Sequence, residues 1–321
     1  MCKVFAIIWM HYRLMMDYVV DFIFSLFWKK KKIPPLKKSH RFLAESAVTL
    51  ARRIKQKKLK SEDLVLAVIE RIKTVDPIIN AVAEECFGSA LIEAKQVDRL
   101  IEAGLSDEEA QRKPFLGVPF TTKEFHSVKG LRVTLGLWCR RDVKATEDCD
   151  SVTKLKNAGA ILVATTNVPE MVLWQETRNM VYGMTLNPHH TGRTPGGSSG
   201  GEAALMAVYG TPISLCSDLG GSIRMPAFYC GLFGHHPTPG TTNCQGIINR
   251  EGDEPSMLSL GFVTKHAEDL APLTSVLTAQ SSDLLRLDSD VDIKSLKFYY
   301  TESSSDPLVS PVRQELKATM N

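Results

Sequence analysis

The first part of the chain is a nearly continuous apolar run from Val4 to Trp28. The run is long enough to cross a bilayer, but Arg13, Asp17 and Asp21 would form one polar stripe along it on a helix. Unpaired charges are costly at the centre of a membrane, so a spanning anchor and a helix lying in the interface both remain open. Lysines at 29–32 favour an anionic lipid surface. The pattern therefore predicts membrane attachment through this segment.

Amphipathic helices are predicted in the next part of the chain. Apolar residues recur at helical spacing over 41–57 and 61–75, and the second of these helices begins with Ser61 as its expected N-cap. A third helix is expected over 89–103, where Gly104 ends it. The charged stretch SDEEAQRK that follows is expected to be a solvated loop. We expect these helices to be scaffold.

Strands alternate with helices in the middle of the chain. Short apolar runs predict strands over 118–122, 160–166 and 212–216. Helices are predicted between and before them, over 151–158 and 202–209. This alternation is typical of an α/β fold.

The end of the sequence predicts an unfinished βα unit. Residues 296–300 are expected to form a strand and 311–320 to begin a helix, and no strand follows before Asn321. We therefore expect two parts, an N-terminal apolar segment with its basic run over 1–38 and a C-terminally truncated domain over 39–321.

Composition and charge exclude several classes of protein. Apolar residues make up 44% of the chain, which is too much for a disordered tail. Lys and Arg number 39 against 36 Asp and Glu, and this balance argues against an electrostatic nucleic-acid binder. The seven cysteines contain no C-x-x-C pair, so neither a zinc knuckle nor a thioredoxin-type site is expected.

Candidate chemistry concentrates in a glycine-rich segment over 192–239, which contains two serine sites. In the first, glycines flank Ser198 and Ser199 and permit unusual backbone conformations and close approach by other groups. In the second, Ser222 follows a strand and a glycine pair and precedes a short helical stretch. Backbone N–H groups converge at such a position, so it can act as an oxyanion hole.

A nucleophilic serine needs a base, and the residues alone leave its identity open. Several histidines are candidates, namely His126, His189, His190, His235 and His236. The other candidate is Lys123, at the end of an apolar strand, where burial would disfavour the charged form and leave a neutral amine. On residue type alone, a surface lysine is the favoured interpretation of Lys123.

Three other motif matches are weak. The stretch GSSGG formally satisfies G-x-S-x-G, but a loop rather than a strand precedes it. GRTPGGSSGG has the glycines of a phosphate-binding loop but lacks the Gly-Lys-Ser/Thr that would follow. The adjacent histidine pairs lack helical ligand spacing, and no metal site is expected.

The glycine-rich segment resembles the defining stretch of the amidase signature family of serine hydrolases, and FLGVPFTTKE resembles that family's lysine-bearing strand. The spacings between the motifs agree with the family pattern. Within the family, RIKQKKLKSEDLVLAVIERIKTVDPIINAV and TNVPEMVLW are most similar to fatty-acid amide hydrolases of the second type. The resemblance implies a mixed β-sheet flanked by helices, incomplete at the C-terminus.

The resemblance also implies a Ser-cisSer-Lys triad: Ser222 as nucleophile, Ser198 in a cis peptide as proton relay and Lys123 as base. Asp218 and Arg224 would then fix the loop rather than react. Oxyanion and substrate contacts are implied, beside the N–H group of the nucleophile itself, for Leu219, Gly220, Gly221, Met171, Val172 and Leu173.

The function that this resemblance implies is a serine amidase on an intracellular membrane that hydrolyses primary fatty-acid amides and N-acylethanolamines. A lipid amide, the membrane and a second copy of the chain in a homodimer are the partners considered, with no cofactor, metal or nucleic acid. Two alternatives stay open. One is an amidase subunit of an amidotransferase, which would normally lack the apolar N-terminus. The other is an inactive, truncated, membrane-bound product.

Overall fold

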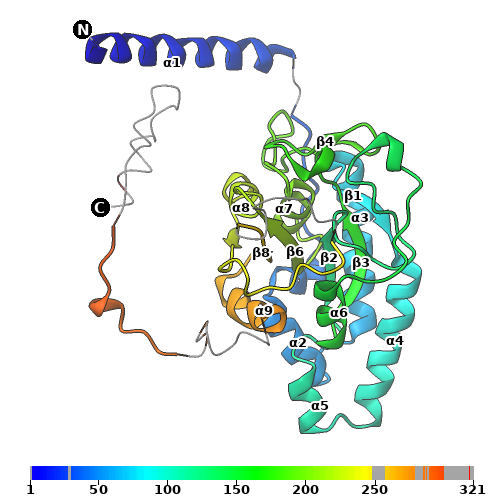
Figure 1. Cartoon of the computed structure of the whole chain (residues 1–321). Helices are drawn as coiled ribbons and strands as arrows, with labels where there is room; N and C mark the ends of the chain where they lie inside the picture. Colours follow the sequence, from blue (N-terminus) through cyan, green and yellow to red (C-terminus); the bar gives the residue numbers. More distant parts are fainter. Residues whose placement is uncertain are drawn as a thin grey trace. The chain divides into compact units, whose positions relative to one another are not determined.

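The structure is a computed structural model that describes residues 2–27, 30–247, 257–278 and 289–299 and the single positions 285, 287 and 318. The chain divides into two compact units (Figure 1). One unit comprises Met1–Lys30 and Asp288–Asn321, and its described elements are α1 (Cys2–Phe27) and a 3₁₀ turn, η7 (Ile293–Ser295). The other unit, Lys31–Leu287, contains the main sheet.

A mixed six-stranded sheet forms the centre of the larger unit. Its strands, in spatial order, are β1 (Val82–Glu85), β3 (Ile161–Thr166), β2 (Pro119–Lys123), β6 (Ile213–Asp218), β8 (Ser259–Thr264) and β7 (Phe233–His235). The three middle strands β3, β2 and β6 are parallel, and the outer pairings are antiparallel. Parallel strands place their carboxyl ends at one edge of the sheet, and this edge carries the candidate site.

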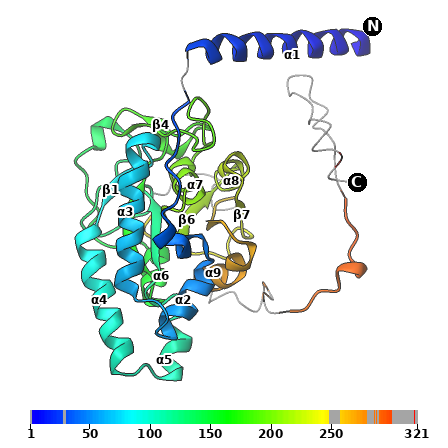
Figure 2. The same ribbon diagram turned by 180° about the vertical axis from the view of Figure 1, so that it is seen from behind.

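Helices cover both faces of this sheet (Figures 1 and 2). The helices α3, α4 and α7 pack on one face, and α6 and α9 on the other. The helices of this unit are α2 (Ala47–Lys55), α3 (Ser61–Ile79), α4 (Phe87–Ala103), α5 (Asp107–Arg112), α6 (Asp150–Asn157), α7 (Gly200–Ala207), α8 (Arg224–Cys230) and α9 (Leu270–Leu277). Short 3₁₀ turns are η1 (Lys38–Ala44), η2 (Trp138–Arg140), η3 (Glu170–Val172) and η5 (Ala267–Asp269), and β4 (Arg178–Asn179) pairs with β5 (Gly183–Met184).

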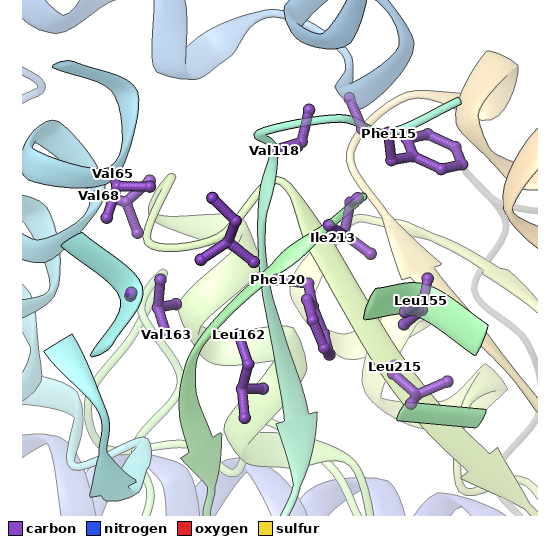
Figure 3. Packing of buried hydrophobic residues seen from close by; sticks show 14 of the residues in the cluster. Val65, Val68, Phe115, Val118, Phe120, Leu155, Leu162, Val163, Ile213 and Leu215 are labelled. Atoms are coloured by element: carbon purple, nitrogen blue, oxygen red, sulfur yellow. The ribbon is translucent and has the colours of Figure 1, made fainter. Parts of the chain in front are cut away.

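The three middle strands begin with apolar residues and are buried on both faces. Every residue of β2, β3 and β6 is buried. Phe120, Leu162 and Ile213 lie at the centre of the cluster in Figure 3, with Val65 and Val68 of α3 packed nearby. This core holds the three parallel strands in place, and therefore also the side chains at their carboxyl ends.

The predicted α/β alternation and mixed sheet are confirmed, but two expected helix details are wrong. The SDEEAQRK stretch contains the helix α5, which Ser106 caps by accepting from the N–H of Glu109. Ser61 does not cap α3; its hydroxyl donates to Gly117 O, and the carboxylate of Asp98 accepts the first N–H groups of the helix. The cap is thus supplied by a neighbouring helix, α4.

The expected helix over 41–57 is shorter in the structure. Residues before Ser46 form η1, and α2 begins only after Ser46, whose side chain accepts from Thr49 N. Near the C-terminus, 296–299 form no strand, and Tyr300 lies outside the described residues. The helix expected over 311–320 also lies outside them, apart from Ala318, which is helical.

The N-terminal apolar segment forms the helix α1, on which apolar side chains such as Tyr18 and Phe22 are exposed. Among the helices that the structure describes, none combines the length and the apolarity that crossing a membrane requires. Arg13, Asp17 and Asp21 lie within this helix and lower its mean hydropathy.

Candidate active site

Lys123 ends the central strand β2, and its side chain is fully buried. Its Nζ donates to Ser198 Oγ at 2.8 Å, to Ser217 Oγ at 2.9 Å and to Ser217 O at 3.3 Å. Burial lowers the pKa of Lys123 to about 8, because an ammonium group loses its hydration inside the protein. A neutral amine is therefore accessible near neutral pH, as a base would need.

Ser198 lies in the glycine-rich loop that leads into α7, and its side chain is buried. The Gly197–Ser198 peptide is cis. Thr177 holds this loop from outside, since its hydroxyl donates to Gly196 O at 2.9 Å and accepts from Gly200 N at 3.1 Å. The loop is thus fixed on both sides of the serine by a single threonine.

Ser222 follows β6 in a turn that the carboxylate of Asp218 closes. This carboxylate accepts from the N–H groups of Gly221 at 2.6 Å and Ile223 at 2.9 Å, and it pairs with Arg224 at 2.9 and 3.0 Å. Burial alone would raise the pKa of Asp218, but the hydrogen bonds from Arg224 and the backbone outweigh it and hold the pKa well below its usual value. The carboxylate stays ionised and keeps the turn in shape.

The backbone N–H groups of this turn are not equivalent. The N–H of Gly221 is taken by Asp218, whereas those of Leu219, Gly220 and Ser222 have no acceptor in the part of the chain that the structure describes. The expectation that all four N–H groups face one oxyanion is therefore reduced to three. The reason is that the carboxylate closing the turn uses the fourth.

A cavity of about 670 Å³ opens beside these groups. Its polar wall is formed by Ser198, Ser217 and Ser222 together with Gln175. The rest of its lining is mostly apolar and comprises Phe125, Val172, Leu173, Trp174, Leu219, Gly220, Met225, Met257 and Leu258. The cavity therefore brings two of the three expected catalytic residues to one surface, and Lys123 reaches it through its bond to Ser198.

The expected substrate-lining residues separate in the structure. Val172 lines the large cavity, Met171 lines a neighbouring one of about 580 Å³, and Leu173 lines both. Trp174, which the sequence did not single out, lines both. Its carbonyl oxygen would lie 2.2 Å from a Cβ at Gly197, so glycine there lets the wall of the cavity approach the loop of Ser198.

None of the candidate histidines lines the cavity. His126 is buried, with Nδ1 2.6 Å from Thr122 Oγ1, and burial, together with the nearby Lys123, lowers its pKa to about 3. His189 Nε2 bonds to the carbonyl oxygen of Cys230. Over the described residues, no group of three His, Cys, Asp or Glu side chains could hold a metal ion. Of the candidate bases, Lys123 is therefore the one bonded to a candidate serine.

Sequence reasoning missed Ser217, Thr177 and Glu202. Ser217 is the penultimate residue of β6 and shares the carboxyl edge with Lys123, so its place on a parallel neighbouring strand was the available signal. Thr177 lies in a loop, and nothing in the sequence connects it to the glycine segment. Glu202 follows the glycines directly, as an acidic residue in an otherwise apolar helix.

The family description Amidase matches residues 63–307, which include the strand of Lys123 and both serine sites. The chain belongs to the amidase signature family. Among its relatives, fatty-acid amide hydrolase 2-A of Danio rerio is 40% identical over 289 residues, which cover 89% of this chain and 54% of the relative. A glutamyl-tRNA(Gln) amidotransferase subunit of Clostridium acetobutylicum is 36% identical over 253 residues, which cover 79% of this chain and 50% of the relative.

The solved structures include a fatty acid amide hydrolase with a TM-score of 0.71 and 25% identity, matched over 84% of this chain and 46% of that one. This amidase signature chain thus spans about half the length of the curated relatives it matches.

Proposed function

We propose that the chain carries the catalytic residues of a serine amidase that acts on fatty-acid amides. The observation that carries the proposal is the buried Lys123–Ser198 hydrogen bond beside a cavity that Ser222 also lines. In this scheme neutral Lys123 takes the proton of Ser198, and Ser198 takes that of Ser222. The Ser222 Oγ then attacks the amide carbonyl, which forms an acyl-enzyme and releases the amine.

The remaining groups of the site suit this reaction. The N–H groups of Leu219, Gly220 and Ser222 are available to bind the negative charge that develops on the carbonyl oxygen. Amines are poor leaving groups, so the relay returns its proton to the departing nitrogen as the C–N bond breaks. Water then hydrolyses the acyl-enzyme, with the relay again acting as base.

The cavity lining supports an apolar acyl group. Phe125, Leu173, Trp174, Met225 and Leu258 offer carbon surface, and burying a hydrocarbon chain against them is favourable. Relatives such as fatty-acid amide hydrolase 2-A of Danio rerio point the same way. Primary fatty-acid amides and N-acylethanolamines, in which a long acyl chain is joined to a small amine, fit this lining.

A second candidate is hydrolysis of glutamine by an amidotransferase subunit, favoured by the relative from Clostridium acetobutylicum. Glutamine carries two charges, and such a substrate needs charged partners in its site. Among the described residues that line the large cavity are Gln175 and three serines but no charged side chain. This lining argues for the lipid amide.

The decisive test is labelling with a fluorophosphonate probe, followed by mapping of the labelled peptide. We expect the label on Ser222. A label on Ser199 would refute the assignment of roles. The same reaction on a full-length relative serves as a positive control, so that an unlabelled chain is distinguished from an inactive probe and supports the alternative of a non-catalytic product.

For the N-terminus, we propose that α1 lies on a lipid surface with its apolar side chains in the interface. The exposed Phe5, Tyr18 and Phe22 support this, as does the lysine run that follows. Deletion of residues 1–28 is expected to reduce co-sedimentation with anionic vesicles. Unchanged sedimentation would show that another surface binds the lipid.

A further inference from the structure

Glu202 is a buried carboxylate that the proposed reaction does not use. It lies in the first turn of α7 and has no exposed surface. It accepts hydroxyl hydrogen bonds from three adjacent strands: from Thr121 on β2 at 2.6 Å, from Thr166 on β3 at 2.8 Å and from Ser214 on β6. Three donors of this kind suit an ionised carboxylate, which can only accept.

These hydroxyls place Glu202 on the face of the sheet from which Lys123 projects. Thr121 lies two residues before Lys123 on β2, so both side chains point to the same face. Thr166 is paired with Lys123 across the β2–β3 ladder. The Glu202 carboxylate is therefore bonded to Thr121, on the same strand as Lys123, and to Thr166, which is paired with Lys123 on the next strand.

Several titratable groups surround Lys123. The titratable groups that interact with Lys123 are Cys216 and Asp218 on β6, Glu202 on α7 and His126 just after β2, of which His126 is a neutral ring. Burial raises the pKa of the Cys216 thiol, which keeps it neutral, and Asp218 is ionised and committed to its own turn. Burial raises the pKa of Glu202 to about 7, so among these described groups its charge changes nearest the titration of Lys123.

We propose that Glu202 is a positioning residue that sets the proton affinity of Lys123 through its charge, without touching the reacting atoms. The inference rests on the proposed function for the role of Lys123 as base. An ionised carboxylate on this face stabilises the ammonium form. Removal of its charge should therefore release the neutral amine at a lower pH.

Lys123 can be titrated directly, by NMR of the chain labelled with ¹³C at lysine Cε, with Lys123→Met to assign its signal. Glu202→Gln keeps the size of the side chain and removes its charge. We expect the midpoint of Lys123 to fall by about 1 pH unit, the lower end of the effect of a nearby opposite charge. An unchanged midpoint would overturn the inference.

Glu124→Gln is a matched control. Glu124 is adjacent to Lys123 in sequence and equally buried, and burial raises its pKa to about 7. Its carboxylate is turned to other partners, since it accepts from Leu135 N at 3.0 Å and from the Tyr182 hydroxyl at 3.1 Å. We expect this variant to leave the Lys123 midpoint unchanged, and an equal shift in both variants would reject a specific role for Glu202.

A second variant tests the inference if Glu202→Gln does not fold. Thr166→Val keeps the carboxylate and removes one of its donors, so Glu202 is less ionised while Lys123 titrates. We expect a smaller downward shift of the Lys123 midpoint, and no shift would count against the inference.

Fluorophosphonate labelling against pH separates the inference from the proposed function. A shifted Lys123 titration without labelling of any variant supports the inference and rejects the proposed reaction. If the labelling rate falls with decreasing pH in the same way in the wild type and in Glu202→Gln, the inference is rejected and the proposed reaction is still supported.

Discussion

The two serine sites of this chain look alike in sequence, since glycines precede both, but they are held in opposite ways. Ser198 is buried, its hydroxyl is bonded to an amine, and a neutral threonine fixes its loop. Ser222 lines the cavity, and an ionised carboxylate fixes its turn. Under the proposed function, this difference separates a serine that passes protons from one that contacts substrate. The following changes would break or sharpen this contrast.

The largest effect is expected from Ser222→Ala, which removes the nucleophile and nothing else. Amide hydrolysis and fluorophosphonate labelling should both disappear, while the circular dichroism spectrum stays that of the parent chain. Activity in the Ser222→Ala variant would mean that Ser222 is not the nucleophile.

The next largest effect is expected from Lys123→Ala, which removes the base. With the pKa of Lys123 at about 8, the neutral amine declines about tenfold per pH unit below that value, so the labelling rate of the wild type should rise with pH and level off above about 8. The variant should lose most of the rate and all of this dependence. If the labelling rate of Lys123→Ala still falls at low pH as in the wild type, another residue is the base.

Ser198→Ala should be slow rather than inactive. Loss of the relay removes proton transfer, worth about 10²- to 10⁴-fold, while the N–H groups around Ser222 still bind the oxyanion. Single-turnover labelling kinetics measure this loss. If Ser198→Ala and Ser222→Ala prove equally inactive, the distinction between the two serines fails.

Asp218→Asn tests the charged support of the Ser222 turn. The amide cannot accept all the hydrogen bonds of the carboxylate, and it leaves Arg224 without its ion-pair partner. We expect the free energy of unfolding to fall by about 3 kcal/mol, the upper end for hydrogen bonds to a charged group. Urea unfolding gives the value, with exposed Asp292→Asn as a control that should change it little.

The smallest effect is expected from Thr177→Val, which removes the neutral support of the Ser198 loop. The carbonyl of Gly196 and the N–H of Gly200 lose one neutral hydrogen bond each, so a loss of about 2 kcal/mol in unfolding free energy is expected. A loss greater than that of Asp218→Asn would reverse the contrast between the two supports.

The positions of the strands can be predicted from the sequence better than the side-chain contacts between distant segments. The apolar runs ending at Lys123 and Thr166 are buried on both faces, so their composition alone indicates central strands. The helix α5 was missed because its charges suggest a loop, although Ser106 and Glu109 carry the spacing of a capping box. A capping box is a local pattern, so it can be identified from the sequence alone.

The site is less predictable because its supports come from distant segments. The resemblance pointed to Lys123, Ser198 and Ser222, but the hydroxyls around Glu202 come from three strands, and no local pattern joins them. The use of the Gly221 N–H by Asp218 likewise depends on how the turn closes. Such contacts arise from packing, so they can be identified only once the fold is known.

The close approach of Trp174 to Gly197 also has a consequence for libraries of variants. Gly197 and Gly220 both lie within two residues of a candidate catalytic serine. A Cβ at Gly197 would overlap the carbonyl oxygen of Trp174, whereas no atom of the described residues beyond its chain neighbours lies within 4 Å of a Cβ at Gly220. In a mutational scan, position 197 should therefore tolerate glycine alone. Position 220 should accept small side chains, which would narrow the cavity and offer a means of selecting among amides of different bulk.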